Sequence, residues 1–198
     1  MIHVTTVRRF AMAAMALGSL AALAPSAAQE TAETVASKAR YTNGTLEFPP
    51  DSVSWVMLGA DLGADYATGA FDPKNPGTIG VVQIEPSAYR YLMEHGQYAD
   101  GTMLLLTFYR AEGQSDPQLR GFVQGAVTAR EIHVIDRKRY PEEGRAFFVF
   151  PGDATQTGVK QPLGSQCVVC HGEHGKLDST FAQFYPPIRQ LIGQAKPR

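Results

Sequence analysis

The segment Thr102–Tyr109 is apolar at nearly every position. A strand with one face in water alternates apolar and polar residues, so a continuous apolar run of this length predicts a strand that is covered on both faces. Such a strand needs a partner strand along each edge to satisfy its backbone. The segment therefore predicts the central strand of a sheet and argues against a chain built only of helices.

Other extended segments lie on both sides of this strand in the sequence. They are rich in β-branched and aromatic residues and are separated mostly by short turns, which favours an antiparallel sheet over parallel βαβ units. A short helix is expected between them, because Pro86 suits its first position and Gly96 is placed to end it. We therefore predict an α+β domain with a mainly antiparallel sheet and a few short helices, and the further strands are expected at 78–84, 119–128, 131–135 and 146–150.

Two more helices are expected near the ends of this region. Asp51 or Ser52 is placed to cap a helix that covers 55–58. Asp178 is placed to cap a helix over Ser179–Tyr185, which the following prolines would end.

The N-terminus has the layout of a secretory signal peptide. Arg8–Arg9 precede an apolar run over 10–23, and small residues then suit cleavage before Gln29. A transmembrane anchor is the alternative, but the run is shorter than the about 20 residues that a bilayer crossing needs, and Pro25 breaks it. We therefore expect a periplasmic protein without a membrane span in its mature form.

The expected organisation is a signal peptide over 1–28, a flexible lead-in over 29–45 and one domain over 46–198. A chain of 198 residues has room for one ordinary core after the leader is removed. The formal net charge of −1 comes from mixed charges without a basic stripe, so we expect no nucleic-acid partner.

The only two cysteines lie in the motif Cys167-Val168-Val169-Cys170-His171. Two thiols about one helical turn apart can each form a thioether with a haem vinyl group, and the next residue presents an imidazole to the iron. In an exported protein the motif predicts one covalently bound haem c on a C-terminal helix, with His171 as the iron ligand.

Three other uses of the motif fit the chain less well. A thioredoxin-like redox pair would need a βαβ context. A zinc site completed by His174 would take four ligands from eight residues, two of them adjacent, which strains a tetrahedron. A structural disulfide between Cys167 and Cys170 would leave His171 without a role.

The sixth coordination position of the iron has no ligand marked by the sequence. Small electron-transfer cytochromes carry the motif near the N-terminus and supply a methionine downstream, but no methionine follows Met103 here. Helical-bundle cytochromes c′ carry the motif near the C-terminus, but the strands conflict with that fold. The remaining candidates, each of which would serve equally as a core or surface residue, are His95, His133, Met57, Met93 and Met103.

The region around the motif resembles the C-terminal signature of the cytochrome P-460 family, which includes the cytochromes c′-beta. The resemblance implies a mainly antiparallel sheet, a homodimer, and a five-coordinate haem with an open distal face. The residues that carry it are Cys167-x-x-Cys170-His171 followed by Asp178, Phe181 and Gln183-Phe184-Tyr185-Pro186, with upstream landmarks in the same order at Trp55–Gly59, Ile84–Tyr89 and Asp100–Thr102.

Three positions decide which activity the resemblance implies. Leu106 stands where hydroxylamine-oxidising members carry a lysine cross-linked to the porphyrin, and leucine has no nucleophile for that bond. Gly80 stands at the position of the family's distal arginine. Glu131 matches a pocket carboxylate and is the candidate catalytic residue, although a solvated carboxylate at a strand end is an equal alternative. With its same-face neighbours Leu104 and Phe108, Leu106 would make the distal wall largely apolar.

The leading hypothesis is a periplasmic cytochrome that binds a small diatomic ligand such as nitric oxide, with Leu106 and Phe108 beside the haem. The alternative is an oxidase of hydroxylamine or nitric oxide, or a peroxidase, in which Glu131 moves protons. A second alternative is an electron carrier, which would require a redox partner protein and a filled sixth position.

Overall fold

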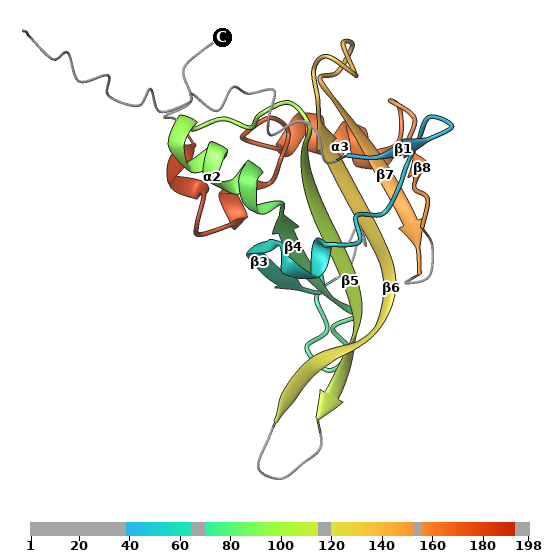
Figure 1. Ribbon diagram of the computed structural model, residues 1–198. Helices are drawn as coiled ribbons and strands as arrows, with labels where there is room; N and C mark the ends of the chain where they lie inside the picture. Colours follow the sequence, from blue (N-terminus) through green and yellow to red (C-terminus); the bar gives the residue numbers. More distant parts are fainter. Residues whose placement is uncertain (1–38, 65–69, 115–119, 153–155, 193–198) are drawn as a thin grey trace, which may run out of the picture.

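The computed structural model describes residues 39–64, 70–114, 120–152 and 156–192 (Figure 1). The expected signal peptide and most of the expected lead-in lie outside these residues. Regular structure begins at a small hairpin, in which β1 (Tyr41–Thr42) pairs with β2 (Thr45–Leu46). Asn43 and Gly44 make the turn between them with φ angles of 52° and 80°, which these two residue types adopt readily.

Six strands form one antiparallel sheet in the order β3-β4-β5-β6-β7-β8, so each strand pairs with its neighbours in sequence. The predicted α+β fold with a mainly antiparallel sheet is confirmed. β5 lies inside the sheet between β4 and β6, as its apolar run predicts. The bounds are β3 Val56–Leu62, β4 Thr78–Ile84, β5 Thr102–Gln114, β6 Gly121–Ile135, β7 Arg145–Pro151 and β8 Val159–Lys160.

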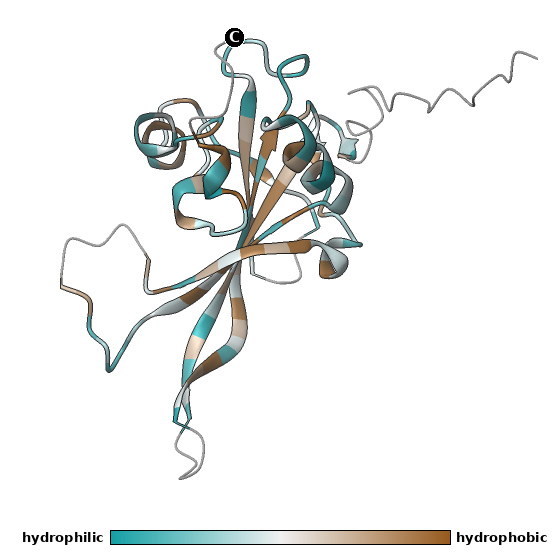
Figure 2. Ribbon diagram, turned by 90° about the vertical axis from the view of Figure 1, so that its left-hand side faces the viewer, coloured by the Kyte–Doolittle hydropathy of each residue, from teal (hydrophilic) through white to brown (hydrophobic). Residues whose placement is uncertain are grey.

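An apolar core covers each face of the sheet. The side chains of β5 alternate between the two cores: Leu104 packs with residues of α2 (Pro86–His95) and of the C-terminal segment, whereas Met103 and Leu105 pack on the opposite face with Trp55. Figure 2 shows hydrophobic residues along the strands where helices cover them. Burial on both faces explains why β5 lacks the alternation of a half-exposed strand.

The hairpin of β5 and β6 extends beyond the rest of the sheet (Figure 1 and Figure 2). β6 unites the two segments that the sequence predicts at 119–128 and 131–135, of which residue 119 lies outside the described residues. The break between these two segments, expected near Arg130, is wrong. The guanidinium of Arg130 lies 3.8 Å from the centre of the Phe48 ring, so this charged side chain is covered while the backbone continues as a strand.

Two short α-helices are present in the described part of the chain. α2 confirms the helix expected from Pro86, and it ends at Gly96, which has a φ of 68°. The carboxylate of Glu85 caps it by accepting backbone N–H bonds from Ser87 and Ala88 at 2.9 and 3.0 Å. α3 (Gln166–His174) carries the cysteine motif. Neither helix is long and apolar enough to cross a bilayer, and the same holds for every other helical segment of the described residues.

The helix expected after Asp51 is wrong. Only a single 3₁₀ turn forms at Ser52–Ser54, without a capping bond from the Asp51 side chain, and the chain then enters β3. The sheet edge offers Val56–Leu62 hydrogen bonds along β4, and this tertiary pairing overrides the local helix-start signals.

The helix expected over Ser179–Tyr185 is also wrong. A single 3₁₀ turn forms at Ala182–Phe184, and another follows at Arg189–Leu191. Asp178 does not cap a helix, because its carboxylate binds the guanidinium of Arg137 at 2.9 Å.

Candidate functional site

A cavity of about 520 Å³ lies between one face of the sheet and the segment that follows α3. Strands β3 to β7, α3 and the C-terminal segment all contribute to its lining, which is mostly apolar. The structure brings five of the sequence-predicted site residues to this cavity, namely Leu106, Phe108, Glu131, Cys170 and His171. Cys167 lies on the same helix one turn before Cys170 and is outside the lining.

His171 enters the cavity from α3. Its Nδ1 lies 2.8 Å from the backbone carbonyl oxygen of Ser179, so an Nδ1–H donates to that oxygen and leaves Nε2 with a free lone pair. Burial lowers the pKa of His171, which favours the neutral ring. A neutral imidazole with one nitrogen fixed by a carbonyl and the other free is the usual state of a histidine that binds a metal.

Aromatic rings from the sheet and from the segment after α3 surround His171. The ring centroids of Phe147 and Phe181 lie 4.7 and 4.6 Å from its own, and that of His133 lies 5.5 Å away in an edge-to-face contact. His133 also stacks on Phe147 at 4.1 Å. These contacts restrict the orientation of the imidazole, so it is held both by a hydrogen bond and by packing.

The two cysteines form no disulfide and lie three residues apart on α3, which places them on the same side of the helix. Both are partly exposed. The two reduced cysteines thus lie on one side of α3, and Cys170 also lines the cavity.

Only one of the five candidate sixth ligands lines the cavity, and the structure describes all five. Met57 and Met93 are exposed, and His95 stacks on Tyr91 at the end of α2. Met103 is buried on the opposite face of the sheet. The remaining candidate is His133, and its ring packs against His171 itself rather than facing it across the cavity.

His133 is buried, and its Nε2 has no hydrogen-bond partner among the described residues. Burial holds its pKa well below the ordinary value, with His171 and Arg145 adding repulsion of a positive charge. His133 is therefore a neutral ring that fills space beside His171.

Leu106 and Glu131 lie side by side on the sheet wall of the cavity. They are register partners on β5 and β6, and Val82 on β4 is the partner of Leu106 on its other side. The row that contains His133 lies two residues further along β6, a distance of roughly 7 Å along the strand. Burial raises the pKa of Glu131, and no charged neighbour offsets it.

Asp61 is a cavity residue that sequence reasoning missed. It is the register partner of Gly80, and the space that a side chain at Gly80 would take is filled by the Asp61 carboxylate. Burial raises its pKa, and bonds from the backbone N–H groups of Ala64 and Gly80 act in the opposite direction. Tyr185 lines the cavity as well, and burial, together with the nearby Asp61 charge, raises its pKa to about 12.

The cavity fits a haem. Its apolar walls suit the faces of a porphyrin, the orphaned lone pair of His171 suits the iron, and the thiols on α3 suit two vinyl groups. The fold and the site thus define a haem-binding protein built on an antiparallel sheet.

The family model of cytochrome P460 matches residues 53–182, which is more than half of the chain and includes the whole cysteine motif. The chain belongs to the cytochrome P460 family and is a haem-binding cytochrome. A search of curated protein sequences finds no significant match.

Proposed function

We propose that this protein is a periplasmic c-type cytochrome that binds one haem covalently and takes up small neutral ligands such as nitric oxide. In this proposal Cys167 and Cys170 anchor the haem, and His171 binds its iron. The observation that carries the proposal is the placement of the sixth-ligand candidates: none of the five, all of them described, faces His171 across the cavity.

The attachment needs no oxidant. Each thiol adds across the double bond of one vinyl group, so that a sulfur–carbon bond forms and the thiol hydrogen ends on the neighbouring vinyl carbon. Both sulfurs must be reduced for this addition, and neither Cys167 nor Cys170 is in a disulfide.

The wall beyond His171 favours neutral diatomic ligands. Val82, Leu106 and Phe108 present hydrocarbon to the cavity, and the lining within the described part of the chain includes no lysine or arginine. Haem iron supplies an open coordination position when it is bound. An apolar wall excludes water from such a position and gives no stabilisation to anionic ligands.

The visible spectrum of the ferrous protein, with and without nitric oxide, tests this function. We expect a high-spin five-coordinate spectrum that changes on addition of nitric oxide. A low-spin six-coordinate spectrum without added ligand would overturn the open-site proposal and favour an electron carrier.

A second candidate function is the oxidation of hydroxylamine, and the carboxyl groups of Glu131 and Asp61 in the cavity favour it. Conversion of hydroxylamine to nitric oxide releases three protons and three electrons. The carboxylates would accept these protons one at a time and pass them on to solvent water, and the three electrons would pass to an external acceptor such as a redox partner protein. A carboxyl with a raised pKa, like that of Glu131, is suited to proton transfer near neutral pH.

Steady-state turnover of hydroxylamine with an artificial electron acceptor separates the two functions. We expect little turnover by the wild-type protein, because Leu106 cannot form the lysine cross-link to the porphyrin that the hydroxylamine-oxidising members carry. Mass spectrometry should accordingly find two protein-to-haem bonds. A third bond, or turnover that Glu131→Gln abolishes, would favour the oxidase.

The periplasmic location and a homodimer belong to the same proposal. Fractionation of cells that express the full chain tests the location, and sedimentation of the holoprotein tests the dimer. Retention in the cytoplasm would contradict the periplasmic location. A monomer at all concentrations would contradict the homodimer.

A further inference from the structure

The turn that holds the hydrogen-bond acceptor of His171 has an unfavourable backbone. Asp178 and Ser179 have φ angles of 45° and 59°, and they are adjacent residues with side chains. A residue other than glycine adopts this region at a cost, although aspartate tolerates it better than most. Two such residues in succession persist only where surrounding contacts hold them.

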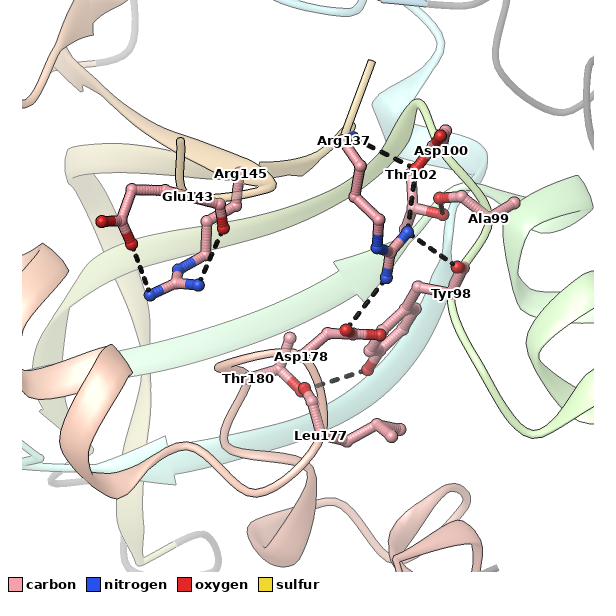
Figure 3. Close-up of polar contacts among 10 residues, drawn as sticks. All are labelled: Tyr98, Ala99, Asp100, Thr102, Arg137, Glu143, Arg145, Leu177, Asp178 and Thr180. Atoms are coloured by element: carbon pink, nitrogen blue, oxygen red, sulfur yellow. Dashed lines mark hydrogen bonds and ion pairs between the residues drawn. The ribbon is translucent and has the colours of Figure 1, made fainter. Parts of the chain in front are cut away.

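Arg137 supplies the strongest of these contacts (Figure 3). One of its terminal nitrogens, Nη2, donates to the Asp178 carboxylate at 2.9 Å, and the other, Nη1, donates to the Asp100 carboxylate at 2.8 Å. The backbone N–H of Arg137 donates to the same Asp100 oxygen at 3.1 Å. Arg137 lies two residues after the end of β6, so the guanidinium ties the turn to the sheet. All three side chains are partly buried, with exposed fractions of 30% for Arg137, 22% for Asp100 and 25% for Asp178, so solvent screens these ion pairs less than fully exposed ones.

Contacts of Thr180 and Ser179 shape the rest of the turn. The Thr180 hydroxyl donates to the carbonyl oxygen of Leu177 at 2.7 Å and lies 3.3 Å from the Tyr98 hydroxyl (Figure 3). The backbone of Ser179 lies so close to Gly175 that no side chain fits between them. None of these contacts involves the carboxylate of Asp178, which binds Arg137. The Nη1 of Arg137 also donates to the backbone carbonyl oxygen of Tyr98 at 3.4 Å, so the guanidinium and Tyr98 support the turn together (Figure 3).

We infer that Arg137 is a positioning residue for His171, acting through Asp178 to keep the Ser179 carbonyl oxygen against Nδ1. The inference rests on the proposed role of His171 as iron ligand. A hydrogen bond from Nδ1–H to a fixed carbonyl raises the basicity of the other nitrogen and thus strengthens its bond to iron. Loss of the guanidinium removes the ion pair at Asp178, lets the turn relax towards an ordinary backbone and lengthens the Ser179–His171 hydrogen bond.

The test compares holoprotein variants by the iron–histidine stretching band in resonance Raman spectra of the ferrous state. We expect Arg137→Gln to shift this band to lower wavenumber and to raise the midpoint potential of the haem, because a weaker hydrogen bond makes the imidazole a poorer donor. Arg139→Gln is the matched control. The Arg139 guanidinium packs on the Tyr41 ring at 3.5 Å, away from the turn, and its replacement should leave both readouts at the wild-type values.

A purely structural role for Arg137 would lower the melting temperature without moving either readout, and that result would overturn the inference. If Arg137→Gln does not fold, Asp178→Asn replaces it, because asparagine tolerates a positive φ while its neutral amide weakens the contact with Arg137. A smaller shift in the same direction supports the inference, and an unchanged band overturns it. Failure of the open-site proposal would be seen separately, as absence of the five-coordinate iron–histidine band in the wild-type protein. In that case, the midpoint potentials of the variants show whether Arg137 positions His171.

Discussion

Leu106 on β5 and Glu131 on β6 are direct partners across the sheet, and both side chains line the same cavity. The sheet therefore places a hydrocarbon and a carboxyl side chain next to each other at the space that a haem would fill. Burial raises the pKa of this carboxyl, and within the described part of the chain no cation counteracts that effect. With leucine rather than a cationic residue at position 106, Glu131 stays protonated to a higher pH than an exposed glutamate does.

Replacement of Glu131 by glutamine should stabilise the holoprotein at neutral pH. Because the folded pKa lies above the ordinary value of 4.5, the wild-type contribution to stability is fully present below that pH and is lost as pH rises through the folded pKa. The stability difference between variant and wild type should therefore grow as pH rises above 4.5 and then level off. Chemical denaturation across this range measures it. Glu131→Asp keeps a carboxyl and is the control, and an advantage of the glutamine variant that is equal at every pH would contradict the prediction.

Leu106→Lys should place an ammonium group opposite Glu131, since directly paired side chains lie about 5 Å apart at Cβ. An opposite charge at that distance lowers the pKa of the carboxyl. We expect a favourable coupling of roughly 1–3 kcal/mol between the lysine and Glu131 in a double-mutant cycle with Glu131→Gln. The double variant should be the least stable, because it leaves a buried ammonium unpaired. Additive effects would show that the two side chains do not meet.

The sheet could be predicted from the sequence because its signals are local. The apolar run of Thr102–Tyr109 indicates that both faces of this strand are buried, without indicating which elements bury them. The helix expected after Asp51 is wrong because an N-cap residue also starts an isolated 3₁₀ turn, and only pairing with β4 decides that the chain continues as a strand. The helix expected after Asp178 is wrong for a related reason, since the competing partner of that carboxylate is distant in sequence.

The candidate site could be predicted where a motif or the family resemblance marks a residue. His171 directly follows the second cysteine of its motif, and the resemblance to the cytochrome P-460 family identifies Glu131 and Leu106. Asp61 lies where glycine and proline content indicates a loop, and its contact with Gly80 exists only through the register of β3 and β4. The ion pair of Arg137 and Asp178 joins residues 41 positions apart, and no local pattern encodes it.

Gly80→Ala should destabilise the protein through Asp61. A Cβ at residue 80 would lie at most 2.9 Å from each of the three carboxyl atoms of Asp61, so the carboxylate has to leave its place. We expect a loss of about 1–3 kcal/mol in the free energy of unfolding, the usual range for overpacking. In an Asp61→Ala background the same substitution should cost much less, which a double-mutant cycle measures.

Gly113→Ala is the matched control for this substitution. Gly113 also lies in a strand, and its Cβ would meet only Phe122, at an ordinary contact distance of 3.7 Å. A cost at Gly113 equal to that at Gly80 would attribute the loss to backbone effects of glycine replacement rather than to Asp61.

Gly175→Ala should reduce the haem content of the purified protein. The new Cβ would lie 2.5 Å from the carbonyl carbon of Ser179 and 2.6 Å from the carbonyl oxygen of His171, both of them backbone atoms. The turn must then move away from α3, and the Ser179 oxygen moves with it from the Nδ1 of His171. The expected cost in stability is roughly 1–3 kcal/mol, measured by denaturation beside the haem-to-protein absorbance ratio. Gly164→Ala is the control, since its Cβ would meet nothing within 4 Å. Equal haem content in the two variants would show that the histidine does not depend on this close approach.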